Sequence, residues 1–179
     1  MARRIPAMKI SFESPLILIE PHTIVKIPIA VSRQLPSRGM VMVKGTLNNL
    51  EFQEPLEPDG IGSHWLDISA SLIVNGNLEV GQTVTLIIES ITQWNEPKIP
   101  KDIMNQLIES GLLEQWQMIT TKARWSWLRW IRATKNPATR QKRIDVACSK
   151  LYKGDRRPCC FDQTKCTVTD VSKSGVLLD

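Results

Sequence analysis

Apolar and polar residues alternate with a period of two over much of the first half of the chain. Leu50 and Phe52 alternate with Glu51 and Gln53, which is the pattern of a strand with one buried and one solvated face. The other apolar stretches are rich in β-branched residues, as strands are. We predict strands over residues 23–30, 40–47, 50–56, 64–68 and 83–89, with one more within 8–19. Short strands at this spacing favour a small barrel or a sandwich.

Turn residues separate these predicted strands. Asn48 and Asn49 lie between two of them, and asparagine tolerates the left-handed backbone of a two-residue hairpin turn, so we predict a β-hairpin there. Pro28 removes a backbone donor from the stretch 23–30, which favours an edge position. Residues 69–74 are expected to form a short helix that ends at Asn75 and Gly76.

The periodicity changes to that of helices after the Pro-rich stretch 95–100. Pro100 suits the first turn of a helix that runs to Gly111, and residues 112–118 continue as a second short helix. A third helix is expected from Thr120 or Thr121 to Thr134. Asn136 and Pro137 form a strong start signal, with asparagine at the cap and proline at the first helical position.

The last predicted helix, residues 137–153, carries one apolar stripe and ends at Gly154. The stripe follows the helical repeat and predicts five buried side chains: Ile144, Ala147, Cys148, Leu151 and Tyr152. A second stripe on the preceding helix contains Trp127, Trp130 and Ile131. These patterns predict an α+β protein in which a small β-barrel is followed by a helical domain of three or four helices. The expected division is 8–94 for the barrel, 95–100 for the linker, 101–157 for the basic helical domain and 158–179 for a cysteine-containing tail.

Composition narrows the class of protein without changing this architecture. The 179 residues are 42% hydrophobic and 23% charged, as in an ordinary folded protein with one core or two small ones. No stretch has the roughly 18 apolar residues that a membrane-spanning helix needs. The N-terminus lacks the apolar core of a secretory signal. We therefore expect a cytoplasmic protein without a membrane span, whose four cysteines are thiols.

Charge is distributed unevenly along the chain. Residues 120–157 hold 12 Lys and Arg against two Asp and Glu, whereas residues 1–119 hold nine against 13. Such asymmetry suggests an acidic partner, either a protein or a nucleic acid, or docking onto the acidic barrel of the same chain. Interleaved tryptophans in residues 124–130 would also suit nucleic acid, because exposed rings stack on bases. The candidate anion-binding residues are Arg129, Arg132, Arg140, Lys142, Arg143, Arg156 and Arg157.

Several short sequences in a fixed order resemble one bacterial family. They include Val43-Lys-Gly-Thr-Leu-Asn48, Gly81-Gln-Thr-Val84, Ile99-Pro-Lys-Asp102, Trp127-Leu-Arg-Trp-Ile-Arg-Ala-Thr-Lys135 and Gly154-Asp-Arg-Arg-Pro-Cys-Cys160. Together they resemble the bacteriocin-protection, or YdeI/OmpD-associated, proteins that carry a small β-barrel domain in front. The resemblance covers roughly residues 23–162 and implies a double-split β-barrel followed by a helical domain. It supplies no catalytic residues.

Residues with catalytic potential are few. The chain has only two histidines, and neither a glycine-rich phosphate loop nor a nucleophile elbow is present. His64 follows a glycine-containing loop and is the one candidate for a loop base or ligand, with a structural histidine as the alternative. We therefore interpret the chain as non-enzymatic and predict no cofactor.

The cysteines lie mostly near the end of the chain. Cys159 and Cys160 are adjacent and Cys166 is six residues further, a spacing that does not suit structural zinc, so no metal site is predicted. Arg156 and Arg157 would favour thiolates, which makes Cys159 and Cys160 candidate reactive thiols. The alternative is a segment that packs Pro158, Cys160 and Phe161 against the helices.

These observations give three hypotheses for function. The first is a binding or stress-protection protein that acts through the basic helical surface or the barrel loops. The second is a nucleic-acid-binding protein that uses the same basic residues. The third is a thiol redox protein that uses Cys159 and Cys160. The sequence leaves the oligomeric state open.

Overall fold

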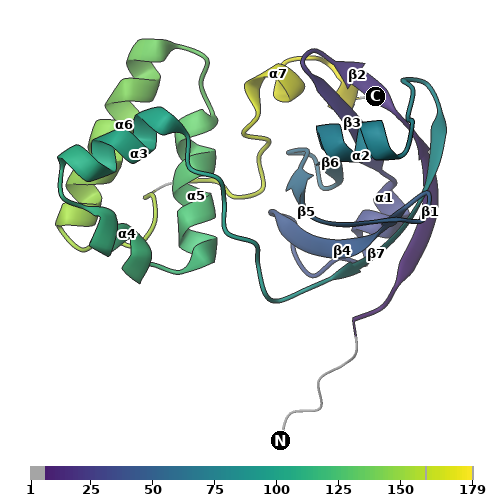
Figure 1. Ribbon diagram of the computed structural model, residues 1–179, viewed down its shortest axis with the longest axis horizontal. Coiled ribbons are helices and arrows are strands. Elements are labelled where there is room, and N and C mark those ends of the chain that lie inside the picture. Colours follow the sequence, from purple (N-terminus) through teal and green to yellow (C-terminus); the bar gives the residue numbers. More distant parts are fainter. Residues whose placement is uncertain (1–6, 160, 179) are drawn as a thin grey trace, which may run out of the picture. The chain divides into compact units, whose positions relative to one another are not determined.

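The computed structural model describes residues 7–159 and 161–178 (Figure 1). Contacts divide the described chain into two units. The barrel unit contains residues 7–93, 163–166 and 170–178, and the helical unit contains the other described residues from 94 to 169. An N-terminal antiparallel barrel followed by helices confirms the predicted α+β class.

Seven antiparallel strands form the barrel. They are β1 (Ile10–Pro15), β2 (Ile17–Ile19), β3 (His22–Ile27), β4 (Val41–Leu47), β5 (Leu50–Pro58), β6 (His64–Asp67) and β7 (Thr83–Ser90). Their order is β1-β7-β4-β5-β6-β3-β2. The Ser14 hydroxyl of β1 donates to the carbonyl of Lys26 in β3, 3.0 Å away, so the two sides of the sheet meet and the barrel is nearly closed.

The predicted strand within 8–19 is two strands. The chain breaks at Leu16, whose backbone N–H donates to Gln82 and whose carbonyl accepts from Gly81. This exchange turns the Leu16 side chain into the core, where it is 2% exposed. The period-two pattern cannot report such a break, because the residues on both sides remain extended.

The β4–β5 hairpin is confirmed. Asn48 and Asn49 have φ of 46° and 70°, both left-handed, as a two-residue turn of this type requires. Gly45 of β4 permits a close approach to β7, because a Cβ at this position would lie 1.8 Å from the carbonyl oxygen of Ile87.

Two short helices complete this part of the barrel unit. Helix α1 (Ile29–Ser32) replaces the end of the strand predicted over 23–30, because Pro28 ends β3 and occupies the N-cap of the helix. Helix α2 (Ala70–Asn75) begins at Ser69, whose hydroxyl accepts from the Leu72 N–H.

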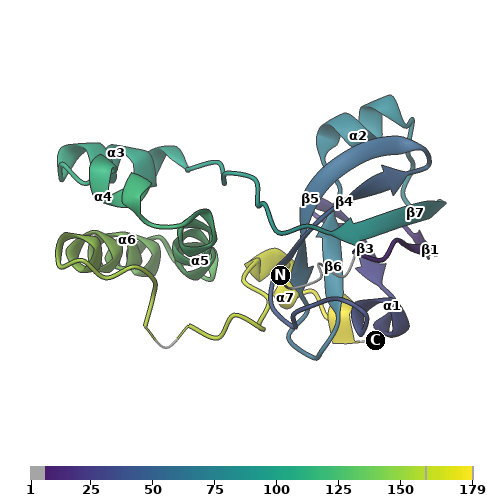
Figure 2. The ribbon, with the colours of Figure 1, turned by 90° about the horizontal axis from the view of Figure 1, so that it is seen from below.

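Four helices form the helical unit, within the predicted number (Figure 2). They are α3 (Lys101–Glu109), α4 (Leu113–Met118), α5 (Thr121–Arg132) and α6 (Pro137–Tyr152). Pro100 occupies the N-cap of α3 rather than its first turn. The Asn136 side chain accepts from the N–H groups of Ala138 and Thr139 and begins α6 as predicted.

The core of the helical unit contains two tryptophans, Trp116 and Trp127, which pack with the apolar stripe of α6. Cys148 belongs to this core, as predicted. The prediction for Tyr152 is wrong: its side chain is 79% exposed, because it is the last helical residue and Leu151 fills the buried position beside it.

The end of the chain forms α7 (Thr169–Ser172) and a 3-10 turn, η1 (Val176–Leu178). Val171 and Leu177 are buried. The Lys26 ammonium of β3 donates to the Val176 carbonyl at 3.0 Å, so this turn is part of the barrel unit. In the described ranges, no helix combines the length and hydropathy needed to cross a membrane.

Candidate functional sites

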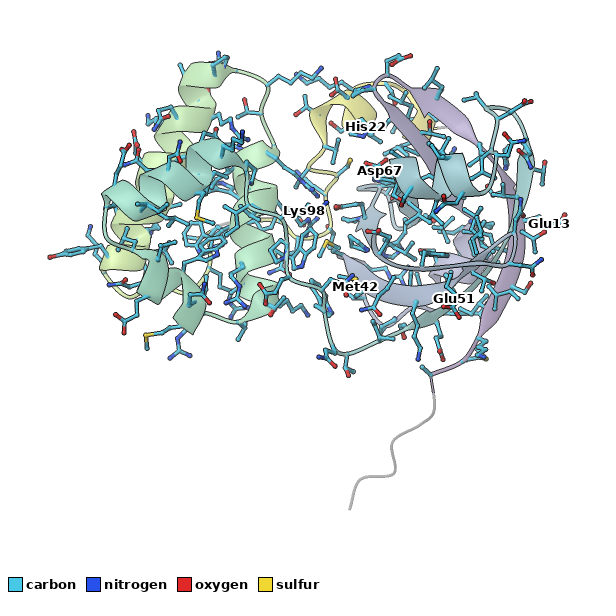
Figure 3. All side chains as sticks on the ribbon, viewed as in Figure 1. Glu13, His22, Met42, Glu51, Asp67 and Lys98 are labelled. Carbon is cyan, nitrogen blue, oxygen red and sulfur yellow. The ribbon has the colours of Figure 1, made fainter. Side chains whose placement is uncertain are left out.

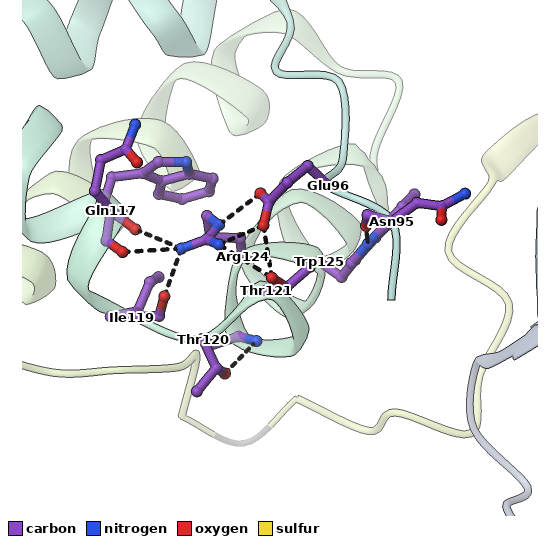
Figure 4. A network of polar contacts seen from close by, with 10 residues as sticks. Asn95, Glu96, Gln117, Ile119, Thr120, Thr121, Arg124 and Trp125 are labelled. Carbon is purple, nitrogen blue, oxygen red and sulfur yellow. Dashed lines mark hydrogen bonds and ion pairs between the residues drawn. The ribbon is translucent and has the colours of Figure 1, made fainter. Parts of the chain in front are cut away.

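The segment before α3 is fastened to α5 by a polar network (Figure 4). The Arg124 guanidinium forms an ion pair with Glu96 and also donates to the carbonyls of Trp116, Gln117 and Ile119. The indole N–H of Trp125 donates to the Asn95 carbonyl at 2.7 Å. The hydrogen bonds from Arg124 lower the pKa of Glu96. Arg124 thus joins this segment and the end of α4 to one helix.

Two of the predicted anion-binding arginines contact residues near the end of the helical unit. Arg129 is 2% exposed, and its guanidinium lies 5.3 Å from the centre of the Phe161 ring. Arg132 donates through Nε to the hydroxyl of Thr167 at 3.3 Å. The Phe161 contact agrees with the predicted packing of the segment after Pro158, while Cys160 lies outside the described residues.

Two further candidates stabilise the helix packing. Arg140 binds both carboxylate oxygens of Asp102, at 2.7 and 3.0 Å. This pairing raises the pKa of Arg140 and lowers that of Asp102. Arg143 donates to the Trp130 carbonyl at 2.6 Å and lies over the Trp130 ring. Both side chains therefore connect α6 to another helix.

The other three candidates, Lys142, Arg156 and Arg157, are exposed. Lys142 of α6 and the exposed Lys153 at its C-cap are eleven positions apart, so they project from the same side of the helix about 16 Å apart. Arg156 and Arg157 follow the end of that helix, where the Trp127 indole N–H donates to the Arg156 carbonyl at 3.1 Å. We call Lys142, Lys153, Arg156 and Arg157 the α6 basic face.

His64 is the first residue of β6 and is buried, directly after the glycine-containing loop. Its Nε2 lies 2.7 Å from the Gly39 carbonyl, which can only accept, so Nε2 carries the proton. Nδ1 then accepts from the Ser32 hydroxyl at 2.6 Å. Arg38 completes this network by donating to the Ser32 hydroxyl and to the carbonyls of Ser32, Leu35 and Gly62. Burial lowers the pKa of His64 and maintains the neutral ring.

The pairing of a serine with a histidine is also found in hydrolases, but this pair is closed to a substrate. Ser32 has no exposed surface and His64 is 1% exposed. Both ring nitrogens are used in hydrogen bonds within the barrel. The arrangement therefore fixes the surrounding loops. No local pattern in the sequence brings Ser32 and Arg38 to His64, so neither was predicted as part of this site.

The loop above His64 lines a cavity of about 470 Å³. Asp59 shapes this loop, since one carboxylate oxygen accepts from the N–H groups of Ile61 and Ser63. The Ser63 hydroxyl donates to the Ile27 carbonyl at 2.8 Å and fastens the loop to β3. The wall includes Lys26, Ile27, Ile29, Asp59, Ile61 and Leu177.

The cysteines have different environments. Cys148 is buried in the helical core, and burial raises the pKa of its thiol. Cys159 is exposed and Cys166 is half-buried. Within residues 7–159 and 161–178, no group of three or more histidine, cysteine or acidic side chains could hold a metal ion.

Two family models match the chain, and the gap between their matches contains the boundary between the two units. Residues 12–88 match the domain of unknown function DUF1905. Residues 96–154 match OmdA, described as bacteriocin-protection, YdeI or OmpD-associated. The chain therefore carries a region similar to DUF1905, followed by a region similar to OmdA. No curated protein matches it.

The two ends of the OmdA match coincide with two features of the helical unit. It begins at Glu96, the partner of Arg124, so this ion pair lies within the match. It ends at Gly154, so Arg156, Arg157 and the thiol of Cys159 lie beyond it. The family description connects the OmdA domain with bacteriocin protection, and the matches confirm the resemblance found in the sequence.

Proposed function

We propose that this protein is a non-enzymatic binding protein of the bacteriocin-protection type that engages an acidic protein partner through the α6 basic face. The observation that supports this proposal most directly is the set of exposed cations left after intramolecular pairing. The OmdA unit, residues 94–162 and 167–169, contains 14 Lys and Arg against seven Asp and Glu. Among the exposed cations that the structure describes, Lys142, Lys153, Arg156 and Arg157 lie on α6 or directly after it and have no ion pair, and these four define the binding face.

Three observations favour a protein partner over nucleic acid. First, Arg129, Arg140 and Arg143 already serve intramolecular contacts. Nucleic-acid binders commonly neutralise about 6–10 phosphates, more than four cations supply.

The second observation concerns tryptophan. Stacking on bases requires open aromatic faces. Trp116 and Trp127 are buried, while Lys122 lies over Trp94 and Arg143 over Trp130. The third observation is Trp125, which is half-buried with its N–H bonded to Asn95. An acidic protein segment needs charge complementarity alone and fits these cations without stacking.

The nature of the polar residues supports a non-enzymatic role. A general base must reach a substrate proton, and His64 is closed off by Ser32 and Gly39. A reactive thiol needs a depressed pKa, whereas that of Cys148 is raised. Cys159 supplies the remaining test of the redox hypothesis, because rapid labelling of this thiol in native protein and loss of a redox activity in Cys159→Ser would favour that hypothesis.

The proposal is tested by reversing charge on the face. Lys142→Glu and Lys153→Glu are combined, and a second variant combines Arg156→Glu with Arg157→Glu. The matched control combines Lys98→Glu with Lys101→Glu, two exposed lysines of the same unit outside the face. The probes are a neutral-capped poly-glutamate peptide and a single-stranded DNA of equal charge.

We expect the wild type and the control to bind the poly-glutamate peptide, and each face variant to bind about tenfold more weakly. In cells, the face variants should fail to restore survival of a deletion strain under bacteriocin challenge. Tighter binding of the DNA, with affinity falling by a logarithmic slope of about three against salt, would instead establish nucleic-acid binding. Equal binding of the peptide by all variants would show that the α6 basic face is not the binding surface.

A further inference from the structure

The DUF1905 barrel contains a cavity that the proposed function does not use. It lies where β3 ends and β6 begins, beside the C-terminal turn η1. Its volume of about 470 Å³ is within the range of roughly 300–1,000 Å³ typical of sites for small ligands. All of its lining residues belong to the barrel unit.

The rim of this cavity is preorganised, because hydrogen bonds fix its loop before any ligand binds. Asp59 accepts two N–H groups of its own loop, and Arg38 donates to the Gly62 carbonyl at 3.0 Å. Gly60 and Gly62 adopt left-handed φ values of 88° and 101°, which the loop path requires. His64 supports the loop from below. A rim of this kind loses little conformational freedom when a ligand binds, which favours affinity.

The wall chemistry suits an uncharged, apolar ligand. It contains one cation, Lys26, and one carboxylate, Asp59, so their charges cancel. Two large apolar side chains on the lining remain in contact with solvent: Ile29 is 46% exposed and Ile61 is 61% exposed. Covering them would remove apolar surface from water, which is favourable.

The C-terminal turn of the chain contributes an apolar peptide segment to the cavity wall. In η1, Leu177 is 4% exposed and forms part of the cavity wall. The preceding carbonyl, that of Val176, accepts a hydrogen bond from Lys26. Leu177 and the Val176 carbonyl thus show how a short apolar peptide lies against this wall. A second such peptide would place its own apolar side chain in the cavity beside Leu177.

We propose that the cavity binds a neutral, apolar peptide segment, which places an aliphatic side chain beside Leu177 and covers Ile29 and Ile61. This site goes beyond the proposed function, since it lies in the other domain and recognises the opposite chemistry. The α6 basic face attracts acidic groups, whereas the cavity selects uncharged apolar side chains.

The test uses the full chain and the peptide acetyl-Ser-Gly-Val-Leu-Leu-amide, whose sequence repeats residues 174–178. Amide NMR spectra are recorded during titration. We expect saturable shifts of the Ile61 and Ser63 signals with the apolar peptide, and none with an acetylated tri-glutamate amide of similar length. Binding to a lipid or to a hydrophobic dye alone, with no response to the peptide, would overturn the assignment of ligand class.

The variant combines Ile29→Ser with Ile61→Ser, and both side chains are exposed enough for the fold to persist. The matched control combines Val74→Ser with Val80→Ser, which are 76% and 55% exposed elsewhere on the barrel unit. We expect the first variant to weaken peptide binding by about tenfold or more and the control to retain it. Unchanged binding in the first variant, or equal loss in the control, would overturn the proposal. The charge-reversal variants of the α6 basic face should bind the peptide as the wild type does, so the two proposals can fail separately.

Discussion

The barrel unit and the helical unit use their polar side chains in different ways. The barrel unit buries His64 and Ser32, and with the half-buried Arg38 they fix loops around a cavity. In the helical unit, Arg124 and Arg140 act near the surface and connect segments through carboxylates and carbonyls. The number of basic residues in a sequence is therefore larger than the number of cations that a partner can reach. His64 also shows that a histidine beside a loop can support the loop without facing solvent.

The largest expected effect comes from the barrel backbone. Gly45→Ala should destabilise the barrel by about 3 kcal/mol or more, because the new Cβ would lie 1.8 Å from the Ile87 carbonyl oxygen. Thr46→Ala, the next residue, is the control and should cost much less. Circular dichroism during urea unfolding measures both. Five of the six tryptophans lie in residues 94–130, so fluorescence follows the helical unit separately. A matching loss of stability in that fluorescence would show that the two units unfold together.

The next effect concerns the buried network. His64→Ala should destabilise the barrel by about 3 kcal/mol, because it leaves the Gly39 carbonyl and Ser32 without their partner and opens a void. His22→Ala is the control, since the exposed pairing of His22 with Asp67 at 2.9 Å, both labelled in Figure 3, should contribute less than about 1 kcal/mol. Equal losses in the two variants, measured by urea unfolding, would contradict a supporting role for His64.

A smaller effect is expected within the helical unit. Arg124→Ala should cost about 2 kcal/mol, because the carbonyls of Trp116, Gln117 and Ile119 lose a charged donor. Glu96→Gln should cost under about 1 kcal/mol, since this side chain is largely exposed. Tryptophan fluorescence during unfolding compares them. A larger loss in Glu96→Gln would mean that the ion pair, and not carbonyl binding, fastens the segment.

The smallest effect depends on pH and separates the units again. The pKa of His64 is lowered from 6.5 in the folded state, so stability is full above that pH. Below it, the unfolded chain binds a proton that the folded chain does not, and stability falls by at most about 1.4 kcal/mol per pH unit until the folded pKa is reached. Asp102 and Glu96 have lowered pKa values, so their contributions are lost only in more acidic solution.

Unfolding followed at pH 7 and pH 5.5 measures this dependence. The barrel should lose stability over this interval in the wild type and not in His64→Gln. The helical unit should be unaffected, because both histidines lie in the barrel. A dependence that persists in His64→Gln would assign the proton uptake to another group.

Local patterns predicted most of the fold. The asparagine pair of the β4–β5 turn and the Asn136 cap of α6 act through their own backbone, so the sequence alone identifies them. The break at Leu16 was missed because it depends on backbone hydrogen bonds to Gln82 and Gly81, far along the chain. Helix α1 was also missed, although Pro28 at its N-cap is a local signal.

The candidate sites were less predictable. Counting charges identified Lys142, Arg156 and Arg157, which are exposed, together with Arg129, which is buried. Whether an arginine meets a partner depends on residues such as Asp102, 38 positions away from Arg140. The cavity had no signal in the sequence, since its walls come from β1, β3, the loop before β6 and the C-terminal turn.

The hydrogen bond from Lys26 to Val176 joins residues 150 positions apart in the sequence. It can form only after Val176 has been synthesised and has left the ribosome. Domains near the N-terminus generally fold first during synthesis. Here the barrel strands emerge early, but Val171 and Leu177, which are buried in the barrel unit, emerge after residues 96–154, which match OmdA. A nascent chain stalled before Val171 therefore has all seven described strands but lacks α7 and η1, and it exposes this part of the barrel unit to chaperones and proteases.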